Sequence, residues 1–341
     1  MKKSILFTLL FVFSLVIAAC SNDEKDEATP AEATSEYPAE VTIGYQIIPN
    51  AELLAKELGL VEEKFPNTKI NWVQFDSGRD VNTAMASGDI DLGLAGSVPV
   101  VTGIANKLAY KVYYIHDIIG EAESLVVNKD LNITSFEDLK GKRLAVPFGS
   151  TAHFSLLKAL DSKNINSNDV EILDMQPQDI LAAWQRGDID GAYVWHPTLG
   201  KIQESNGQNL VTSEELATEG IITSDIGIVS NSFSEQYPQF VKDYKSILDD
   251  AISKYREDPN NVAKTLTSAL GVTEAEVLAQ IEGLIWINEK EQQAADYLGS
   301  ADQIGQFAQI LETTGTFLVE QKIISSNPKL STFEEAIYYN K

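Results

Sequence analysis

Two segments place serine and threonine hydroxyls and a glycine where an expected strand gives way to an expected helix. Residues 147–151 (Pro-Phe-Gly-Ser-Thr) form one segment, and residues 94–97 (Leu-Ala-Gly-Ser) form the other. The first backbone N–H groups of a helix have no partner within it, and the helix dipole is positive at that end. Such turns bind anions, and Ser97, Ser150 and Thr151 would add hydroxyl donors. An ordinary helix cap uses the same residue types, so neither segment alone decides between the two readings.

Two acidic residues and a tryptophan form a second candidate group. Glu123 and Asp225 each stand just before a short β-branched segment, and Trp195 follows the apolar run Ala-Tyr-Val. Carboxylates bind an ammonium group by charge, and a tryptophan face binds it by cation–π contact. The alternatives are a packed core aromatic for Trp195 and solvated loop charges for Glu123 and Asp225.

Motifs for catalysis and cofactor binding are absent from the sequence. It contains no Walker A motif, no Gly-x-Gly-x-x-Gly after a strand, no His-Glu-x-x-His and no Gly-x-Ser-x-Gly. His116, His153 and His196 lie far apart, and none has a second metal ligand four residues further on. We therefore expect no catalytic residue, no metal, no cofactor and no enzymatic activity.

The only cysteine, Cys20, follows a positively charged start and the apolar residues 5–17, a pattern typical of a signal peptide over residues 1–19. The sequence Ile-Ala-Ala-Cys resembles a bacterial lipobox, which implies that Cys20 is lipidated, for example with palmitate, and becomes the new N-terminus. The apolar run is shorter than the ~18 to 20 residues that a spanning helix needs. We expect an extracytoplasmic protein that is lipid-anchored to the cell membrane and has no free thiol.

Composition and charge narrow the range of partners. Residues 20–38 are rich in Glu, Asp, Ala, Thr and Pro and predict a flexible tether. The formal net charge is −24, and it becomes −26 once Lys2 and Lys3 leave with the signal peptide. We therefore expect no nucleic acid partner and no binding to an anionic membrane surface. A small anionic ligand is still possible in physical terms, because helix N-termini make a pocket locally positive.

The following residues alternate strand and helix patterns. Strands are expected at 41–45, 69–75 and 90–95, with helices at 51–58 and 80–87. The same order recurs, with strands at 143–146, 170–173 and 189–194 and helices at 152–160 and 180–184. A helical tail follows at 240–255, 261–270, 274–284, 301–321 and 332–339. The alternation predicts an α/β protein with mainly parallel sheets covered on both faces, and we expect the tail to pack on the first lobe.

One turn occurs twice, 99 residues apart, at residues 88–91 and 187–190 (both Gly-Asp-Ile-Asp). Glycine suits the left-handed residue that ends a helix, and aspartate beside it is usually turn chemistry rather than catalysis. The alternative is coincidence, but the repeat favours two lobes of similar plan. With crossovers at 125–127 and 226–229, we expect lobe 1 to comprise residues 39–126 and 228–341 and lobe 2 to comprise residues 127–227.

These segments together resemble the taurine-binding proteins of ABC importers, within the periplasmic-binding-protein family of taurine, aliphatic sulfonate and nitrate binders. The resemblance is carried by Ala-Gly-Ser-Val-Pro at 95–99, by residues 145–157 and by Ala-Ala-Trp-Gln-Arg-Gly-Asp-Ile-Asp-Gly-Ala-Tyr-Val-Trp at 182–195. It extends over nearly all of residues 40–325. It implies a two-lobed, type II periplasmic-binding-protein fold that closes by a hinge. It also implies an ABC permease as partner, and we expect the chain to act as a monomer.

The resemblance implies roles for individual residues. Taurine carries a sulfonate at one end and an ammonium at the other, which agrees with the two candidate groups. By position, the sulfonate is received by Ser97, Ser150, Thr151 and Ala152, with His153 nearby. Glu123 and Asp225 pair with the amine, and Gln46 and Trp195 shape the space between.

Three functions remain open from the sequence. The first is a receptor that passes taurine or a similar small sulfonate to a permease. The second is an enzyme on the same fold, which would need a reactive group in the cleft, where His153 is the only histidine expected. The third is a sensory lobe that contacts a membrane kinase. The missing thiol and the bare lipoprotein plan favour the receptor, whose exact sulfonate stays undecided.

Overall fold

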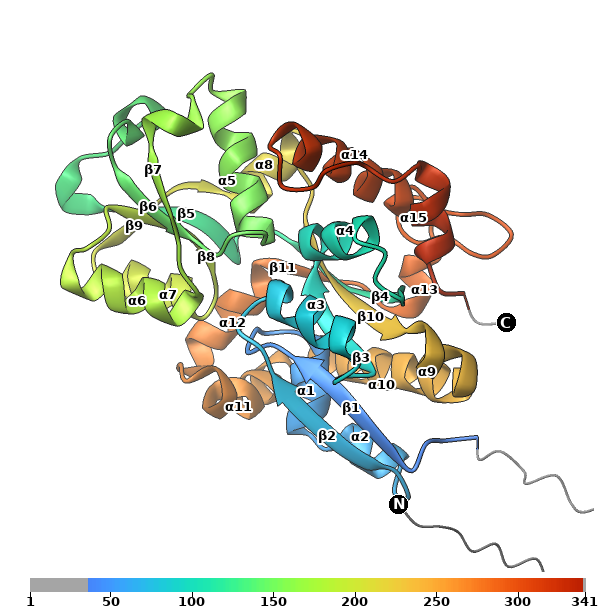
Figure 1. The fold of residues 1–341 in the computed structure, drawn as a ribbon. Helices are drawn as coiled ribbons and strands as arrows, with labels where there is room; N and C mark the ends of the chain where they lie inside the picture. The colour runs from blue at the N-terminus through green and yellow to red at the C-terminus, as the bar shows by residue number, and fades with distance from the viewer. Residues whose placement is uncertain (1–35, 340–341) are drawn as a thin grey trace, which may run out of the picture. The chain divides into compact units, whose positions relative to one another are not determined.

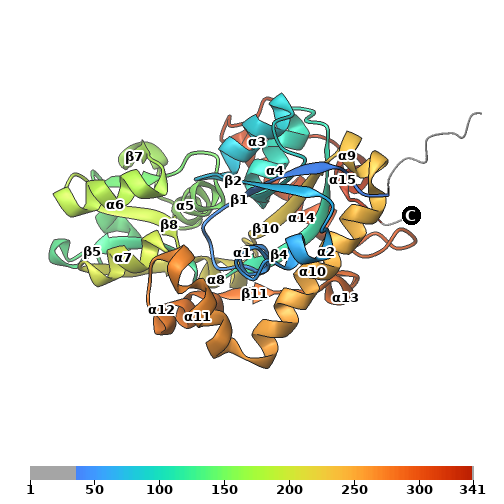
Figure 2. The same ribbon diagram turned by 90° about the horizontal axis from the view of Figure 1, so that it is seen from below.

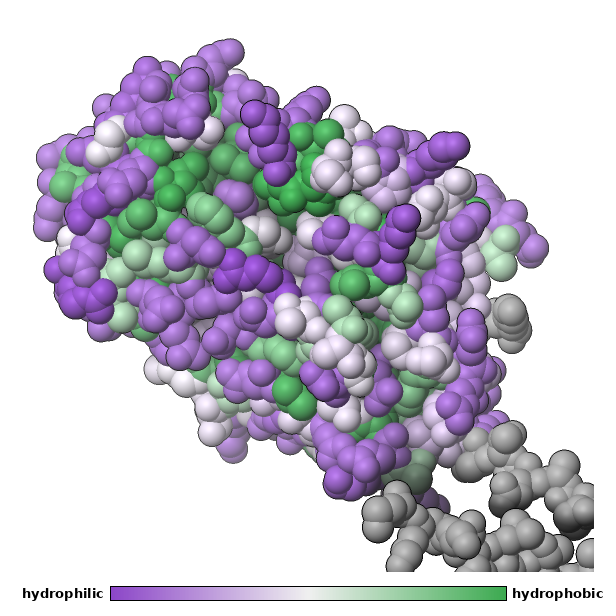
Figure 3. Space-filling model, in the orientation of Figure 1, coloured by the Kyte–Doolittle hydropathy of each residue, from purple (hydrophilic) through white to green (hydrophobic). Residues whose placement is uncertain are grey.

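The computed structural model describes residues 36–339 (Figure 1). The expected signal peptide, Cys20 and most of the expected tether lie outside the described residues. Hydrophilic residues cover most of the face that Figure 3 shows, in keeping with the net charge of −24. No helix between residues 36 and 339 is long and apolar enough to cross a membrane.

Two β-sheets organise the described residues, and they lie side by side in both ribbon views (Figures 1 and 2). We call the unit on the six-stranded sheet, β11-β4-β10-β3-β1-β2, the first lobe, and the unit on the five-stranded sheet, β7-β6-β8-β5-β9, the second lobe. The first sheet contains β1 (Glu40–Tyr45), β2 (Lys69–Gln74), β3 (Leu92–Gly96), β4 (Tyr110–Ile119), β10 (Ser224–Ser230) and β11 (Leu284–Trp286). The second contains β5 (Glu123–Asn128), β6 (Arg143–Val146), β7 (Glu171–Asp174), β8 (Gly191–Trp195) and β9 (Gly207–Thr212).

Helices cover both faces of each sheet. Helices α1, α10 and α11 form one core with β1, while α4 and α14 form another with β10. In the second lobe, α6 and α7 pack on one face and α5 on the other. The helices before β10 are α1 (Ala51–Glu57), α2 (Leu60–Lys64), α3 (Gly78–Ser87), α4 (Ser97–Ala105), α5 (Thr151–Ser162), α6 (Pro177–Arg186), α7 (Thr198–Glu204) and α8 (Ser213–Thr218). The later helices are α9 (Asn231–Gln236), α10 (Pro238–Glu257), α11 (Pro259–Leu270), α12 (Glu274–Glu282), α13 (Glu289–Gln292), α14 (Phe307–Glu320) and α15 (Leu330–Ala336).

The two-lobed α/β architecture confirms the sequence prediction, but the sheets are mixed rather than mainly parallel. Strand β1 is parallel to β2 and β3, and β6 is parallel to β7 and β8. In contrast, β10 is antiparallel to β3 and β4, and β5 is antiparallel to β8 and β9. Parallel neighbours need a crossover connection, usually a helix, whereas β5 and β10 arrive from the other lobe and pair antiparallel with their neighbours.

The chain passes from the first sheet to the second between β4 and β5, and it returns between β9 and β10. The passages are residues 120–122 and 213–223, and the second includes α8. The expected boundaries at 126/127 and 227/228 fall inside β5 and β10, each of which lies whole in one sheet. The lobe ranges themselves stay a prediction.

The duplicated turn has the same structural role in both lobes. Its glycine ends α3 in one copy and α6 in the other, in the left-handed conformation with φ of 77° and 73°. In the first lobe, Oδ2 of Asp91 accepts from the amide of Thr42 at 2.9 Å. In the second, Oδ2 of Asp190 accepts from the amide of Arg143 at 2.8 Å. Each aspartate therefore binds a backbone amide of the neighbouring strand, as turn chemistry predicts.

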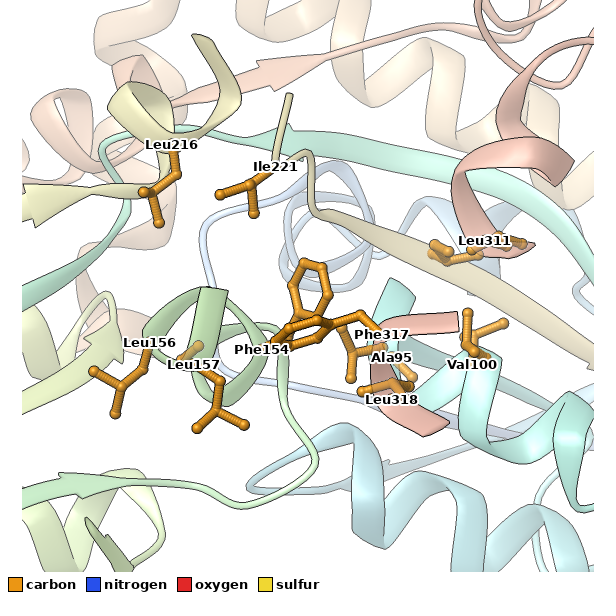
Figure 4. Packing of buried hydrophobic residues seen from close by; sticks show 14 of the residues in the cluster. Ala95, Val100, Phe154, Leu156, Leu157, Leu216, Ile221, Leu311, Phe317 and Leu318 are labelled. Carbon is orange, nitrogen blue, oxygen red and sulfur yellow. The ribbon is translucent and has the colours of Figure 1, made fainter. Parts of the chain in front are cut away.

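The helical tail contacts both lobes. The expected helix 301–321 begins only at Phe307, as α14, and packs against α4 of the first lobe. The ring of Phe317 in α14 also meets the ring of Phe154 in α5, with centroids 5.4 Å apart (Figure 4). One buried cluster thus runs from the first lobe through α14 into the second. The tail packs on the first lobe as expected, and it also touches the second.

Candidate ligand-binding site

A cavity lies between the two lobes, where several strands end and helices begin. The empty volume of the cavity, including its mouth that opens to solvent, is about 490 Å³. Six of the nine residues expected from the sequence line it, namely Gln46, Glu123, Ser150, Thr151, Trp195 and Asp225. The strand-end rule for open α/β sheets therefore brings residues from distant parts of the chain to one place.

Three helices begin at the cavity wall. Gly78 is the first residue of α3, Gly96 precedes the first residue of α4, and Ser150 caps α5. The Ser150 hydroxyl accepts from the amide of His153 at 3.1 Å, whereas no side chain caps α3 or α4 by a hydrogen bond. The positive ends of three helix dipoles consequently converge, which is the arrangement that binds an anion without a basic side chain.

Glu123, at the start of β5, is held by hydroxyl groups from two helices. Its Oε2 accepts from Oγ1 of Thr151 at 2.5 Å, and its Oε1 accepts from Oγ of Ser213 at 3.0 Å. Burial raises the pKa of Glu123 to about 7, although both hydroxyl bonds favour the ionised form and lower it. The carboxylate is thus fixed in place, with lone pairs still available for a cation.

Asp225, on β10, carries a second carboxylate at the cavity wall. It lies opposite Gly96 in the β10–β3 pair, and therefore close to the start of α4. Its side chain keeps an exposed face toward the cavity, but the surrounding protein raises its pKa to about 7. Among the described residues, neither a lysine nor an arginine lines the cavity.

Asp117, which the sequence analysis missed, lies next to this site. It faces Asp225 in the β10–β4 register and is fully buried. Neither carboxylate oxygen has a hydrogen-bond partner of normal geometry among the described residues. Burial and the neighbouring Asp225 raise its pKa well above the usual range, and the backbone amide of Asp225 offsets only part of this effect. No sequence pattern marks it, because the register of two strands that lie far apart in the chain places it.

Three expected site residues do not line the cavity. Ser97 is buried, and its hydroxyl accepts from the amide of Ser224 at 3.4 Å. Ala152 is fully buried in the first turn of α5. The ring of His153 stacks on Phe148 with centroids 4.5 Å apart, and burial lowers its pKa to about 4. All three residues are buried, and none is among the residues that line the cavity.

His196 lines the cavity, in place of the histidine expected there. It follows Trp195 at the end of β8, so the strand-end rule that selected Trp195 also applied to it. Its Nδ1 is buried without a hydrogen-bond partner, and burial lowers its pKa to about 4. A neutral imidazole thus meets the cavity beside the tryptophan.

Gln46, Ile48 and Trp195 line both the cavity and a larger space of about 1,320 Å³, which residues of both lobes also line. The amide nitrogen of Gln46 donates to the carbonyl of Leu94 at 3.0 Å, which fixes its orientation. The expected role of Gln46 and Trp195 in shaping the binding space stays a prediction.

The lobes touch around the cavity. Nη1 of Arg79 lies 2.8 Å from Oδ2 of Asp174, and Nε2 of Gln176 donates to Oδ2 of Asp80 at 3.2 Å. Each pair joins α3 to the other lobe, where Asp174 ends β7 and Gln176 precedes α6. Within residues 36–339, no group of three or more His, Cys, Asp or Glu side chains is placed to hold a metal ion.

Two lobes of one plan that enclose a cavity lined by residues of both define the class of two-lobed ligand-binding proteins. A family model described as the substrate binding domain of ABC-type glycine betaine transport system matches residues 39–268. The chain belongs to this family of substrate-binding domains of ABC transport systems.

Individual relatives agree with this assignment. The chain is 35% identical to the taurine-binding periplasmic protein of Escherichia coli (strain K12) over 288 residues, 82% of this chain and 86% of the relative. It is also similar to the alkanesulfonate-binding protein SsuA from Xanthomonas axonopodis pv. citri bound to MOPS. The TM-score is 0.75 and the identity 26%, with 89% of this chain and 99% of SsuA covered.

The fold also occurs in an enzyme. The desulfurization enzyme DSZB superposes with a TM-score of 0.62 at 18% identity, covering 87% of this chain and 96% of the enzyme. At this identity the likeness concerns the fold alone, and function has to be argued from the site.

Proposed function

We propose that this protein is the extracytoplasmic substrate-binding component of an ABC importer, and that it captures taurine or a similar short amino-sulfonate between its lobes. One observation carries the proposal: the cavity combines three helix N-termini with two carboxylates and lacks a lysine or arginine among its described lining residues. The 35% identity to the taurine-binding protein of Escherichia coli supports it.

The charges of the cavity suit a zwitterion. A sulfonate is anionic over the whole physiological pH range, so the neutral dipoles of α3, α4 and α5 suffice to bind it. A plain anion would also face Glu123 and Asp225, whose charge has no counter-ion in the cavity wall. An ammonium group on the ligand provides that counter-ion through charge-assisted hydrogen bonds. Glu123 and Asp225 are therefore proposed to bind the amine, with Thr151 and Ser150 beside the sulfonate.

The remaining roles follow from the same site. The protein performs no chemistry on its ligand, and a lobe-closed, ligand-bound form is what the permease recognises. The described cavity lining contains no cysteine, and the sole cysteine of the chain, Cys20, lies outside the described residues. The chain acts as a monomer and needs no cofactor.

A lipid anchor at Cys20 completes the proposal. The lipobox-like sequence supports it, and Cys20 lies outside the described residues. Metabolic labelling with a fatty-acid analogue should mark the wild-type chain in a bacterial host and leave Cys20→Ser unmarked. Equal labelling of both chains would contradict the proposed lipid anchor at Cys20 and would leave the proposed ligand binding unaffected.

Calorimetric titration of the purified protein tests the substrate class. Taurine, ethanesulfonate, a longer alkane sulfonate and nitrate form the panel. We expect taurine to bind most tightly, because it alone satisfies both the helix N-termini and the carboxylates. Tightest binding of the longer sulfonate would instead favour an aliphatic sulfonate binder, the alternative that the similarity to SsuA supports. Silence from all four would contradict the proposed function.

A further inference from the structure

Asp117 and Asp225 form a pair of carboxyl groups at the base of the cavity. They lie directly opposite each other in the antiparallel β10–β4 pair, so their side chains share one face of the sheet. Opposite residues in such a pair have Cβ atoms about 4.5–5.5 Å apart. Asp225 reaches the cavity, and Asp117 lies beside it without a hydrogen-bond partner of normal geometry for either oxygen.

No cation compensates this pair in the described part of the chain. The charge of Glu123 on β5 also raises the pKa of Asp117, and Glu123 itself is held by hydroxyl groups of α5 and α8. On β4 itself, His116 is fully buried and neutral, because burial lowers its pKa to about 3. On β11, Trp286 lies opposite Asp117, and it offers only an indole N–H. On β10, the neighbouring Ser224 offers only a hydroxyl.

Two carboxylates this close in a water-poor site cannot both ionise without a counter-ion. They titrate as a unit, and the first proton to bind is shared between them. An ammonium group that enters beside Asp225 supplies the missing positive charge and makes the shared proton unnecessary.

We propose that Asp117 and Asp225 hold one proton between them while the cavity is empty, and that the ammonium end of the ligand replaces this proton. The inference rests on the proposed function and deepens it. The balance is simple: a carboxylic acid, a carboxylate and an ammonium become two carboxylates and an ammonium, and one proton goes to the buffer. Asp117 thus acts in specificity without lining the cavity, because only a ligand with a cationic end can displace the proton.

The inference predicts the pH dependence of binding. Below neutral pH the ligand competes with the shared proton, so affinity for taurine should rise from pH 6 to pH 8. Ethanesulfonate has no ammonium, and its affinity should not rise over this range. The pKa values of Asp225 and Glu123, both raised to about 7 by burial, agree with titration in this window.

Calorimetry in two buffers of different ionisation enthalpy at pH 7 counts the protons directly. We expect a net release of protons when taurine binds and no release when ethanesulfonate binds. Asp117→Asn keeps the shape of the side chain and should lower the count, and Asp225→Asn should do the same. Glu52→Gln is the matched control, because Glu52 is a buried carboxyl group bonded to Tyr244 and does not line the cavity. Its proton count should equal that of the wild type.

The outcomes distinguish failure of the inference from failure of the proposed function. Taurine binding without proton release would overturn the inference and leave the proposed function standing. An unchanged proton count in both Asp117→Asn and Asp225→Asn would overturn it as well, because the proton would then come from another group. If the wild-type protein bound neither taurine nor ethanesulfonate, both the proposed function and the inference would be contradicted.

Discussion

Replacing Gly96 with alanine should weaken ligand binding by preventing full contact between the lobes. Gly96 has φ of −63° and ψ of 159°, a conformation that alanine adopts without strain. A Cβ at this position would lie 2.7 Å from Cγ2 of Thr151 in the other lobe. Carbon atoms in contact lie about 3.5–4.0 Å apart, so the lobes would have to separate by about 1 Å. The effect therefore falls on closure rather than on the fold of either lobe.

The expected magnitude follows from the cost of overpacking. Adding a methyl group to a filled site costs about 1–3 kcal/mol. At about 1.4 kcal/mol per tenfold change, taurine should bind roughly 5- to 150-fold more weakly to Gly96→Ala, as measured by calorimetry. The melting temperature without ligand serves as the control for folding.

A second substitution tests the mechanism. Thr151→Ser removes Cγ2 and keeps the hydroxyl that donates to Glu123. The next atoms from the added Cβ are Oγ1 of Thr151 at 3.6 Å and Cδ of Pro99 at 3.7 Å, which are ordinary contacts. The double variant should therefore recover most of the affinity of Thr151→Ser alone. Wild-type affinity in Gly96→Ala, or no recovery in the double variant, would refute the reasoning.

Further predictions concern the charged groups. Asp225→Asn should weaken taurine by about 1.5–3 kcal/mol and ethanesulfonate much less in parallel titrations, and equal weakening would remove Asp225 from the amine site. The ion pair of Arg79 with Asp174 is 43% and 40% exposed, so a double-mutant cycle on taurine affinity should give a coupling below about 1 kcal/mol. Burial raises the pKa of Glu52 to about 8, so the folded state holds a proton that the unfolded chain releases. Thermal melts should therefore show the wild type losing stability relative to Glu52→Gln as the pH rises from about 5 to 8, and parallel curves would contradict this.

The sequence could predict two kinds of feature: strands and helices with a local pattern of apolar residues, and site residues at the ends of parallel strands. The strand 143–146 and the helix over 261–270 have short-range signals, alternating or periodic apolar residues beside glycine or proline, and both occur. The candidate site was predictable because the ends of parallel strands meet at one edge, which brings Ser150 and Trp195 together. Site residues at these strand ends can therefore be predicted without knowing which residues of distant strands pair with each other.

Features that depend on long-range register could not be predicted in this way. Asp117 belongs to the site because β4 and β10 pair at one particular register, which nothing local specifies. The antiparallel entry of β5 and β10 likewise depends on the path of the chain between the lobes. The late start of α14 has a similar cause: Gly305 donates to the carbonyl of Leu298 and fixes a loop there, although residues 301–306 allow a helical pattern.

A crystal structure with bound taurine tests the central claim most directly. The account predicts the taurine nitrogen within hydrogen-bond distance of the carboxylates of Glu123 and Asp225, and the sulfonate at the first turns of α3, α4 and α5. A reversed taurine, with its sulfonate against the carboxylates, would contradict the account, as would taurine bound outside the cavity.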